Sequence, residues 1–257
     1  MVEAWQNKIP LSAIIFESVC VICLIVITFF LWKKYLERQK RPVLFLGLNF
    51  SFFTMAVFVD IIGRWIGYFS YPNISYLDVS YTDLTTLLNY ILLAIANCFV
   101  IIFIDEVFLH KGTKFVLPFG VLNGLVIGLT IPPVIGWFSD SEFGLLREQI
   151  GVIIVFAVIS VVTYGILAFF AIKEGVLNTE RLPKIGFHLI GTFGVCLVLL
   201  FLSFAGDTFI IQIIARYDQG YSPFFYLGFA LSILGIVLGF LGYIMPSWFK
   251  NIFSKTQ

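Results

Sequence analysis

Residues 149–172 read QIGVIIVFAVISVVTYGILAFFAI, an uncharged stretch that lies between Glu148 and Lys173. An α-helix needs about 20 mostly apolar residues to cross the hydrocarbon core of a bilayer, and this stretch is long enough. Six other stretches have the same apolar character, at 10–32, 42–70, 83–109, 114–138, 185–215 and 223–245. We therefore predict an all-α protein, a polytopic integral membrane bundle of seven transmembrane helices.

The composition of the chain supports this class and excludes others. Hydrophobic residues make up 60% of the 257 residues and charged residues 12%, against roughly 25% charged residues in soluble domains. So few charges exclude a soluble or a disordered protein, and a net charge of +1 gives no basic field that would attract nucleic acid. The connections between the spans are short, so we expect residues 1–257 to form one membrane domain whose main partner is the lipid bilayer.

The basic residues predict the direction of the bundle. One set of connections contains twelve of them: Lys33, Lys34, Arg38, Lys40, Arg41, Lys111, Lys114, Lys173, Arg181, Lys184, Lys250 and Lys255. The other set contains three: Lys8, Arg147 and Arg216. Because Lys and Arg accumulate in cytoplasmic loops, we expect a multi-pass protein of the cell membrane with its N-terminus outside and its C-terminus in the cytoplasm.

Ionisable residues within the spans are costly, so each suggests a partner or a function. Counting about 1.5 Å per residue from the loops places six polar residues in the outer half of the bundle. They are Glu17, Asp60, Arg64, Asn89, Asp207 and Gln212. Asp60 and Arg64 are four residues apart, so they share a helical face and can pair. If the side chains converge, they would form an outward-facing pocket for a small cationic ligand or a cation. The alternatives are a structural network between spans and helix ends exposed to water.

A second polar group is predicted at the cytoplasmic face. Asp105 and Glu106 end the third span, while Lys184 and His188 begin the sixth. A network of ion pairs between these residues would be able to hold one conformation of a switch. The alternative is simple pairing of acids near the interface with basic loops.

Small residues mark the faces where membrane helices approach closely. Gly120, Gly124 and Gly128 form a stripe on the fourth span, where they favour either packing within the chain or a homodimer face. Other glycines at helical spacing are Gly63, Gly67, Gly228, Gly235, Gly239 and Gly242.

No H-E-x-x-H, G-x-S-x-G or Walker A motif occurs, so we do not expect an enzyme. No residue pattern suggests a metal site or a cofactor. All the lysines lie in loops or at helix ends, which argues against a retinal protein.

The layout resembles the seven-helix sensor regions at the N-termini of some histidine kinases. The similar features are an outside N-terminus, a strongly basic first inner loop (33–41) and a tight second inner turn (109–114). This resemblance implies a stand-alone sensor or receptor-like module that signals through a protein partner at its cytoplasmic face.

Two alternatives stay open. The first is a small ion- or proton-coupled transporter, because spans 1–3 and 5–7 have the same direction, as in a parallel three-plus-one-plus-three carrier. The second is a structural accessory subunit of a membrane complex.

Overall fold

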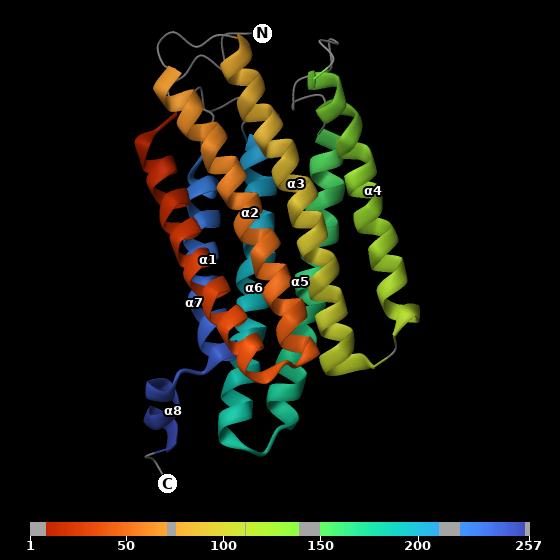
Figure 1. Cartoon of the computed structure of the whole chain (residues 1–257), viewed down its shortest axis with the longest axis vertical. Helices are drawn as coiled ribbons and strands as arrows, with labels where there is room; N and C mark the ends of the chain where they lie inside the picture. Colours follow the sequence, from red (N-terminus) through yellow and green to blue (C-terminus); the bar gives the residue numbers. More distant parts are fainter. Residues whose placement is uncertain (1–8, 71–75, 111, 139–149, 211–221, 255–257) are drawn as a thin grey trace.

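The structure is a computed structural model that describes residues 9–70, 76–110, 112–138, 150–210 and 222–254. Its helices run nearly side by side, and the last short helix lies beside the lower end of the bundle in Figure 1. They are α1 (Leu11–Arg38), α2 (Arg41–Ser70), α3 (Tyr76–Ile104), the π-helical turn η2 (Asp105–Leu109), α4 (Thr113–Phe138), α5 (Ile150–Leu177), α6 (Arg181–Phe209), α7 (Pro223–Ile244) and α8 (Ser247–Ser254).

Seven of these helices are long and apolar enough to cross a membrane, which confirms the predicted number of spans. We call the end of the bundle where α1 begins its N-terminal side and the end that carries α8 its C-terminal side. The direction of the bundle relative to a membrane stays a prediction.

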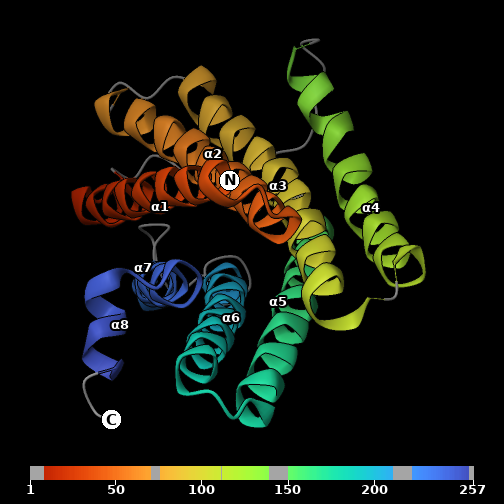
Figure 2. The ribbon, with the colours of Figure 1, turned by 60° about the horizontal axis from the view of Figure 1, so that its bottom comes forward.

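Six helices form a closed ring. In the order α1, α2, α3, α5, α6 and α7, each packs against the next, and α7 returns to α1. The seventh helix, α4, lies outside this ring against α3 and α5, as the tilted view in Figure 2 shows. It is also the least buried of the seven spans.

Aromatic rings fill the centre of the ring of helices. Phe193 of α6 stacks on Phe50 of α2, with ring centroids 5.7 Å apart. The edge of the same ring meets Tyr164 of α5 at 6.5 Å and Tyr243 of α7 at 6.1 Å. Because Phe193 contacts three other helices, its burial holds opposite sides of the helix bundle together.

Several helices are longer than the predicted spans. The structure continues α1 to Arg38 instead of residue 32 and α5 to Leu177 instead of residue 172, and it begins α6 at Arg181 instead of residue 185. The prediction followed the apolar residues, but a helix satisfies its own backbone hydrogen bonds and so continues into polar sequence outside the hydrocarbon layer. Two further elements, the π-turn η2 and the amphipathic helix α8, were not predicted.

Candidate functional site

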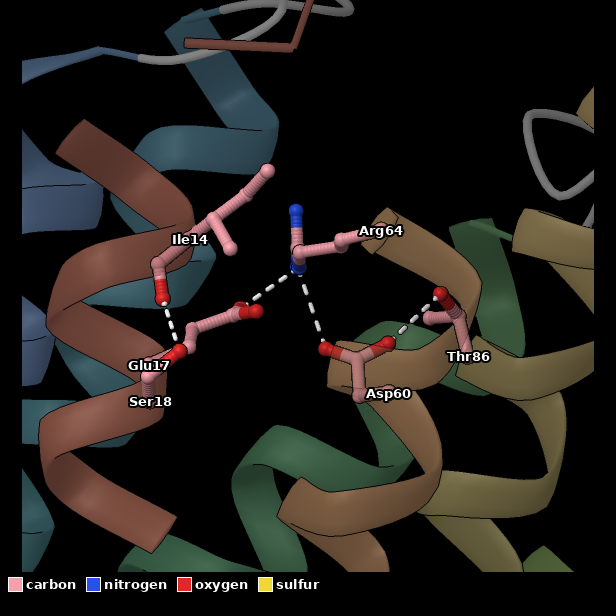
Figure 3. A network of polar contacts seen from close by, with 6 residues as sticks. All are labelled: Ile14, Glu17, Ser18, Asp60, Arg64 and Thr86. Atoms are coloured by element: carbon pink, nitrogen blue, oxygen red, sulfur yellow. Dashed lines mark hydrogen bonds and ion pairs between the residues drawn. The ribbon is translucent and has the colours of Figure 1, made fainter. Parts of the chain in front are cut away.

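A group of charged residues lies at the N-terminal side of the ring, and Glu17 of α1 is its most buried member. The side chain of Glu17 is 0% exposed, and its Oε1 atom is 2.5 Å from Nε of Arg64 on α2. Figure 3 shows the two side chains reaching toward each other across the gap between their helices. The ion pair therefore ties α1 to α2.

Arg64 also binds Asp60, one helical turn earlier on α2. Its terminal nitrogen donates to Asp60 Oδ2 at 3.1 Å, which confirms the pairing predicted from the four-residue spacing. The other oxygen of Asp60 accepts a hydrogen bond of 3.1 Å from the Thr86 hydroxyl of α3. We call Glu17, Asp60, Arg64 and Thr86 the charged cluster, and it connects three helices.

Close packing of α2 against α3 brings Asp60 and Thr86 together. A Cβ atom on Gly63 would lie 1.9 Å from the Thr85 hydroxyl oxygen, so only glycine fits at this position. The prediction that glycines on the second span mark a packing face is confirmed at Gly63.

The N-terminal end of α7 completes the surroundings of Arg64. The guanidinium carbon lies 5.0 Å from the ring centroid of Phe225, within cation–π range. One residue further, the Tyr226 hydroxyl hydrogen-bonds the Ser12 hydroxyl of α1 at 2.9 Å. The charged cluster therefore lies where α1, α2, α3 and α7 meet.

The charges of the cluster do not balance. Two carboxylates share one guanidinium, which leaves a formal charge of −1 when all three groups are ionised. Moreover, the second carboxylate oxygen of Glu17, Oε2, is buried and has no hydrogen-bond partner among the described residues. A buried charge without full compensation is costly, so the cluster has the capacity to take up one positive charge.

Asp207 lies near the end of α6 and has partners of its own. Its Oδ1 atom accepts hydrogen bonds from the backbone N–H of Ser222 at 2.9 Å and from the Ser222 hydroxyl at 2.5 Å. Ser222 in turn caps α7, since its side-chain oxygen accepts from the Phe224 N–H. Asp207 also interacts electrostatically with Arg64. It thus lies within range of the charged cluster while fixing the start of α7.

The remaining predicted pocket residues differ in position. Asn89 lies on α3, one turn after Thr86, and its buried side-chain oxygen has no hydrogen-bond partner in the part of the chain that the structure describes. Gln212 lies outside the described residues. Within the described ranges, no group of three or more His, Cys, Asp or Glu side chains is arranged to hold a metal ion.

The predicted cytoplasmic switch residues lie at the C-terminal side. Asp105 begins η2, and one of its carboxylate oxygens accepts a hydrogen bond of 2.8 Å from the Gly112 N–H. Glu106 follows Asp105 in the same turn.

The other two predicted switch residues, Lys184 and His188, are one turn apart on α6. The His188 ring packs against Gly175 of α5, where an added Cβ would lie 2.9 Å from the Nδ1 atom of His188. Between η2 and α6, the ring centroids of Phe108 and Phe187 are 5.9 Å apart. An ion-pair switch at this place stays a prediction.

Sequence reasoning did not find Thr86, Phe225 or Ser222. The spacing of Thr86 and Asn89 by three residues indicates a shared helical face, and Ser222 before Pro223 is a typical N-cap signal. No sequence signal places the Phe225 ring under Arg64, because that contact depends on how α7 is rotated.

Comparisons with protein-family models, with curated proteins and with solved structures found no match to this chain.

Proposed function

We propose that the protein is a multi-pass membrane sensor in which the charged cluster takes up one cation, a proton or a small cationic ligand, from the outer side. The observation that carries this proposal is the fully buried Glu17, with one carboxylate oxygen paired to Arg64 and the other without a hydrogen-bond partner. The excess of Lys and Arg toward the C-terminal side supports the outward direction of the cluster.

Uptake of a positive charge would change how α1 is held. Helix α1 packs mainly against α2 and α7, and the Glu17–Arg64 ion pair lies in the contact with α2. Neutralising Glu17 weakens its attraction to Arg64, so that of the two acids only Asp60 still forms an ion pair with the guanidinium group. A shift of α1 against α2 would then carry the signal to the other end of both helices, where a separate protein reads it.

The first experiment measures thermal unfolding of the purified chain in lipid nanodiscs while pH and the concentration of ammonium or guanidinium ions are varied. A ligand that binds only the folded state stabilises it by about 2.7 kcal/mol at a hundredfold excess over its dissociation constant. We expect the native chain to be stabilised by the cation that it senses, whether a proton or an organic cation.

The matched variants are Glu17→Gln, which keeps the shape of the side chain without its charge, and Glu37→Gln, which removes an exposed acid from the same helix. Glu37→Gln should keep the cation response, and Glu17→Gln should lose it. An unchanged response in Glu17→Gln would contradict the proposal.

A small carrier is the second candidate, because buried polar atoms also lie outside the charged cluster. The hydroxyls of Thr163 on α5 and Tyr243 at the end of α7 are buried and have no hydrogen-bond partner among the described residues. Such groups would suit a polar pathway that is open to both sides in turn.

Thiol labelling separates the two candidates. The native cysteines Cys20, Cys23, Cys98 and Cys196 are replaced, and a single cysteine is placed at position 17 or 207. A single cysteine at position 37 serves as the control and reports the direction of the bundle. Labelling of position 17 by an impermeant reagent from both sides would favour a carrier, and labelling only from the side opposite to position 37 would favour a sensor.

A further inference from the structure

The short helix α8 exposes apolar side chains at the C-terminal side of the bundle. Trp248 and Ile252 are separated by one helical turn, and they are 56% and 57% exposed. They lie on the same edge of α8, because residues four apart share a helical face. Figures 1 and 2 show α8 beside the end of α7, projecting away from the other helices.

A second edge of α8, about 100° around the helix from the first, faces the protein. The Arg181 guanidinium at the start of α6 lies 5.9 Å from the ring centroid of Phe253, and the rings of Phe253 and Phe249 are 5.0 Å apart. These contacts set the rotation of α8, so the edge with Trp248 and Ile252 points outward.

A basic group surrounds the junction between α7 and α8. The Lys34 ammonium group of α1 donates hydrogen bonds to the last carbonyls of α7, at 2.6 Å to Tyr243 and 3.0 Å to Ile244. Lys34 also lies close enough to Arg38 and Lys250 for these positive charges to repel one another, and Glu37 is the acid that interacts with it. Three positive charges against one negative charge leave this place attractive to an anion.

The position of α8 fits the surface of a bilayer. The 22 residues of α7 extend for about 33 Å at 1.5 Å per residue, close to the thickness of the hydrocarbon core. The chain then turns at Met245, whose φ of 44° ends α7 in the left-handed conformation, and α8 begins two residues later. An amphipathic helix that directly follows a span begins at the level of the lipid headgroups.

We propose that α8 and the basic group of Lys34, Arg38 and Lys250 bind the headgroup of an anionic phospholipid, while Trp248 and Ile252 enter the boundary between headgroups and acyl chains. The apolar edge supplies contact with any bilayer, and the three positive charges supply the preference for an anionic one. This binding site is independent of the charged cluster at the other side of the bundle.

The test measures quenching of Trp248 by brominated lipids in nanodiscs. The contribution of Trp248 is the difference between the native chain and Trp248→Phe, since the chain has four other tryptophans. We expect brominated phosphatidylglycerol, doped into a phosphatidylcholine bilayer, to quench Trp248 more strongly than brominated phosphatidylcholine at the same fraction. High salt should reduce this preference.

The variant Lys250→Gln should lower the preference for the anionic lipid by about fivefold, the effect of one basic residue near an anionic surface. Lys250→Arg, which keeps the charge, should retain the preference. Lys173→Gln at the end of α5 is the control, because it removes a basic residue from the same side of the bundle without touching α8. Equal quenching by both lipids, or the same loss in the Lys173 variant, would overturn the proposal.

Discussion

The glycines of α4 and those of α6 have opposite surroundings in the structure. On α6, a Cβ atom at Gly194 would lie 3.0 Å from the backbone nitrogen of Ala168 and from the carbonyl oxygen of Tyr164 on α5. On α4, a Cβ atom at Gly120, Gly124 or Gly128 would meet nothing within 4 Å. The same type of residue therefore allows close contact in one helix and lies uncovered in the other.

A stripe of small residues therefore indicates a face where close contact is possible, but it does not identify the helix or protein that makes the contact. The face of α4 that packs on the bundle carries Asn123, Val126 and Thr130, all of which are fully buried. The glycine stripe lies on another side of the helix, so packing within the described part of the chain does not account for it. The homodimer face predicted from the sequence stays a prediction.

The largest effect is expected from Gly194→Leu. Its Cβ would press on the backbone of α5, which cannot move aside as a side chain can, and the two helices would have to separate. We expect a loss of about 3 kcal/mol or more in stability. The measurement is the unfolding midpoint of the purified chain in nanodiscs, and a midpoint within error of the native value would show that the α5–α6 contact is looser than described.

A smaller loss is expected from Gly228→Ala on α7. The added methyl group would lie 2.8 Å from the edge of the Phe204 ring, which is a side chain and can shift. We expect a loss of roughly 1–3 kcal/mol, part of which Phe204→Leu should restore. A double-mutant cycle tests this, and additive losses would mean that the two positions do not contact each other.

The smallest effect on stability is expected from Gly124→Ala. Nothing obstructs the methyl group, and alanine favours a helix interior over glycine, so the folded chain should gain up to about 1 kcal/mol. A clear loss of stability would show that this face is covered.

The bulkier Gly124→Leu distinguishes a dimer face from a face covered by lipid. If two copies pack through this stripe, energy transfer between labelled copies in vesicles should fall, because leucine prevents close approach of the helices. The control is Leu122→Ala, an exposed residue on the side of the same helix away from the stripe. Unchanged energy transfer in Gly124→Leu would show that two copies do not associate through the glycine stripe.

The candidate site was predictable in part. The spacing of Asp60 and Arg64 within one helix predicted their pairing, and the ion pair of 3.1 Å between their side chains confirms it. The partner of Glu17 was not predictable, because depth in the membrane follows from counting residues whereas direction follows from the rotation of each helix. Asp207 illustrates the same limit, since its nearest partner is Ser222, which follows it by fifteen residues.

The sequence by itself determined the class of protein and the number of spans, because in a bilayer a run of apolar residues must satisfy its backbone within a helix. Tertiary structure alone decided which helices form the ring, that α4 lies outside it, and that Arg64 is shared between Glu17 and Asp60. The physical reason is that apolar side chains pack almost equally well against lipid and against protein. Hydropathy therefore determines which residues lie within the membrane, but not which face of a helix contacts its neighbours.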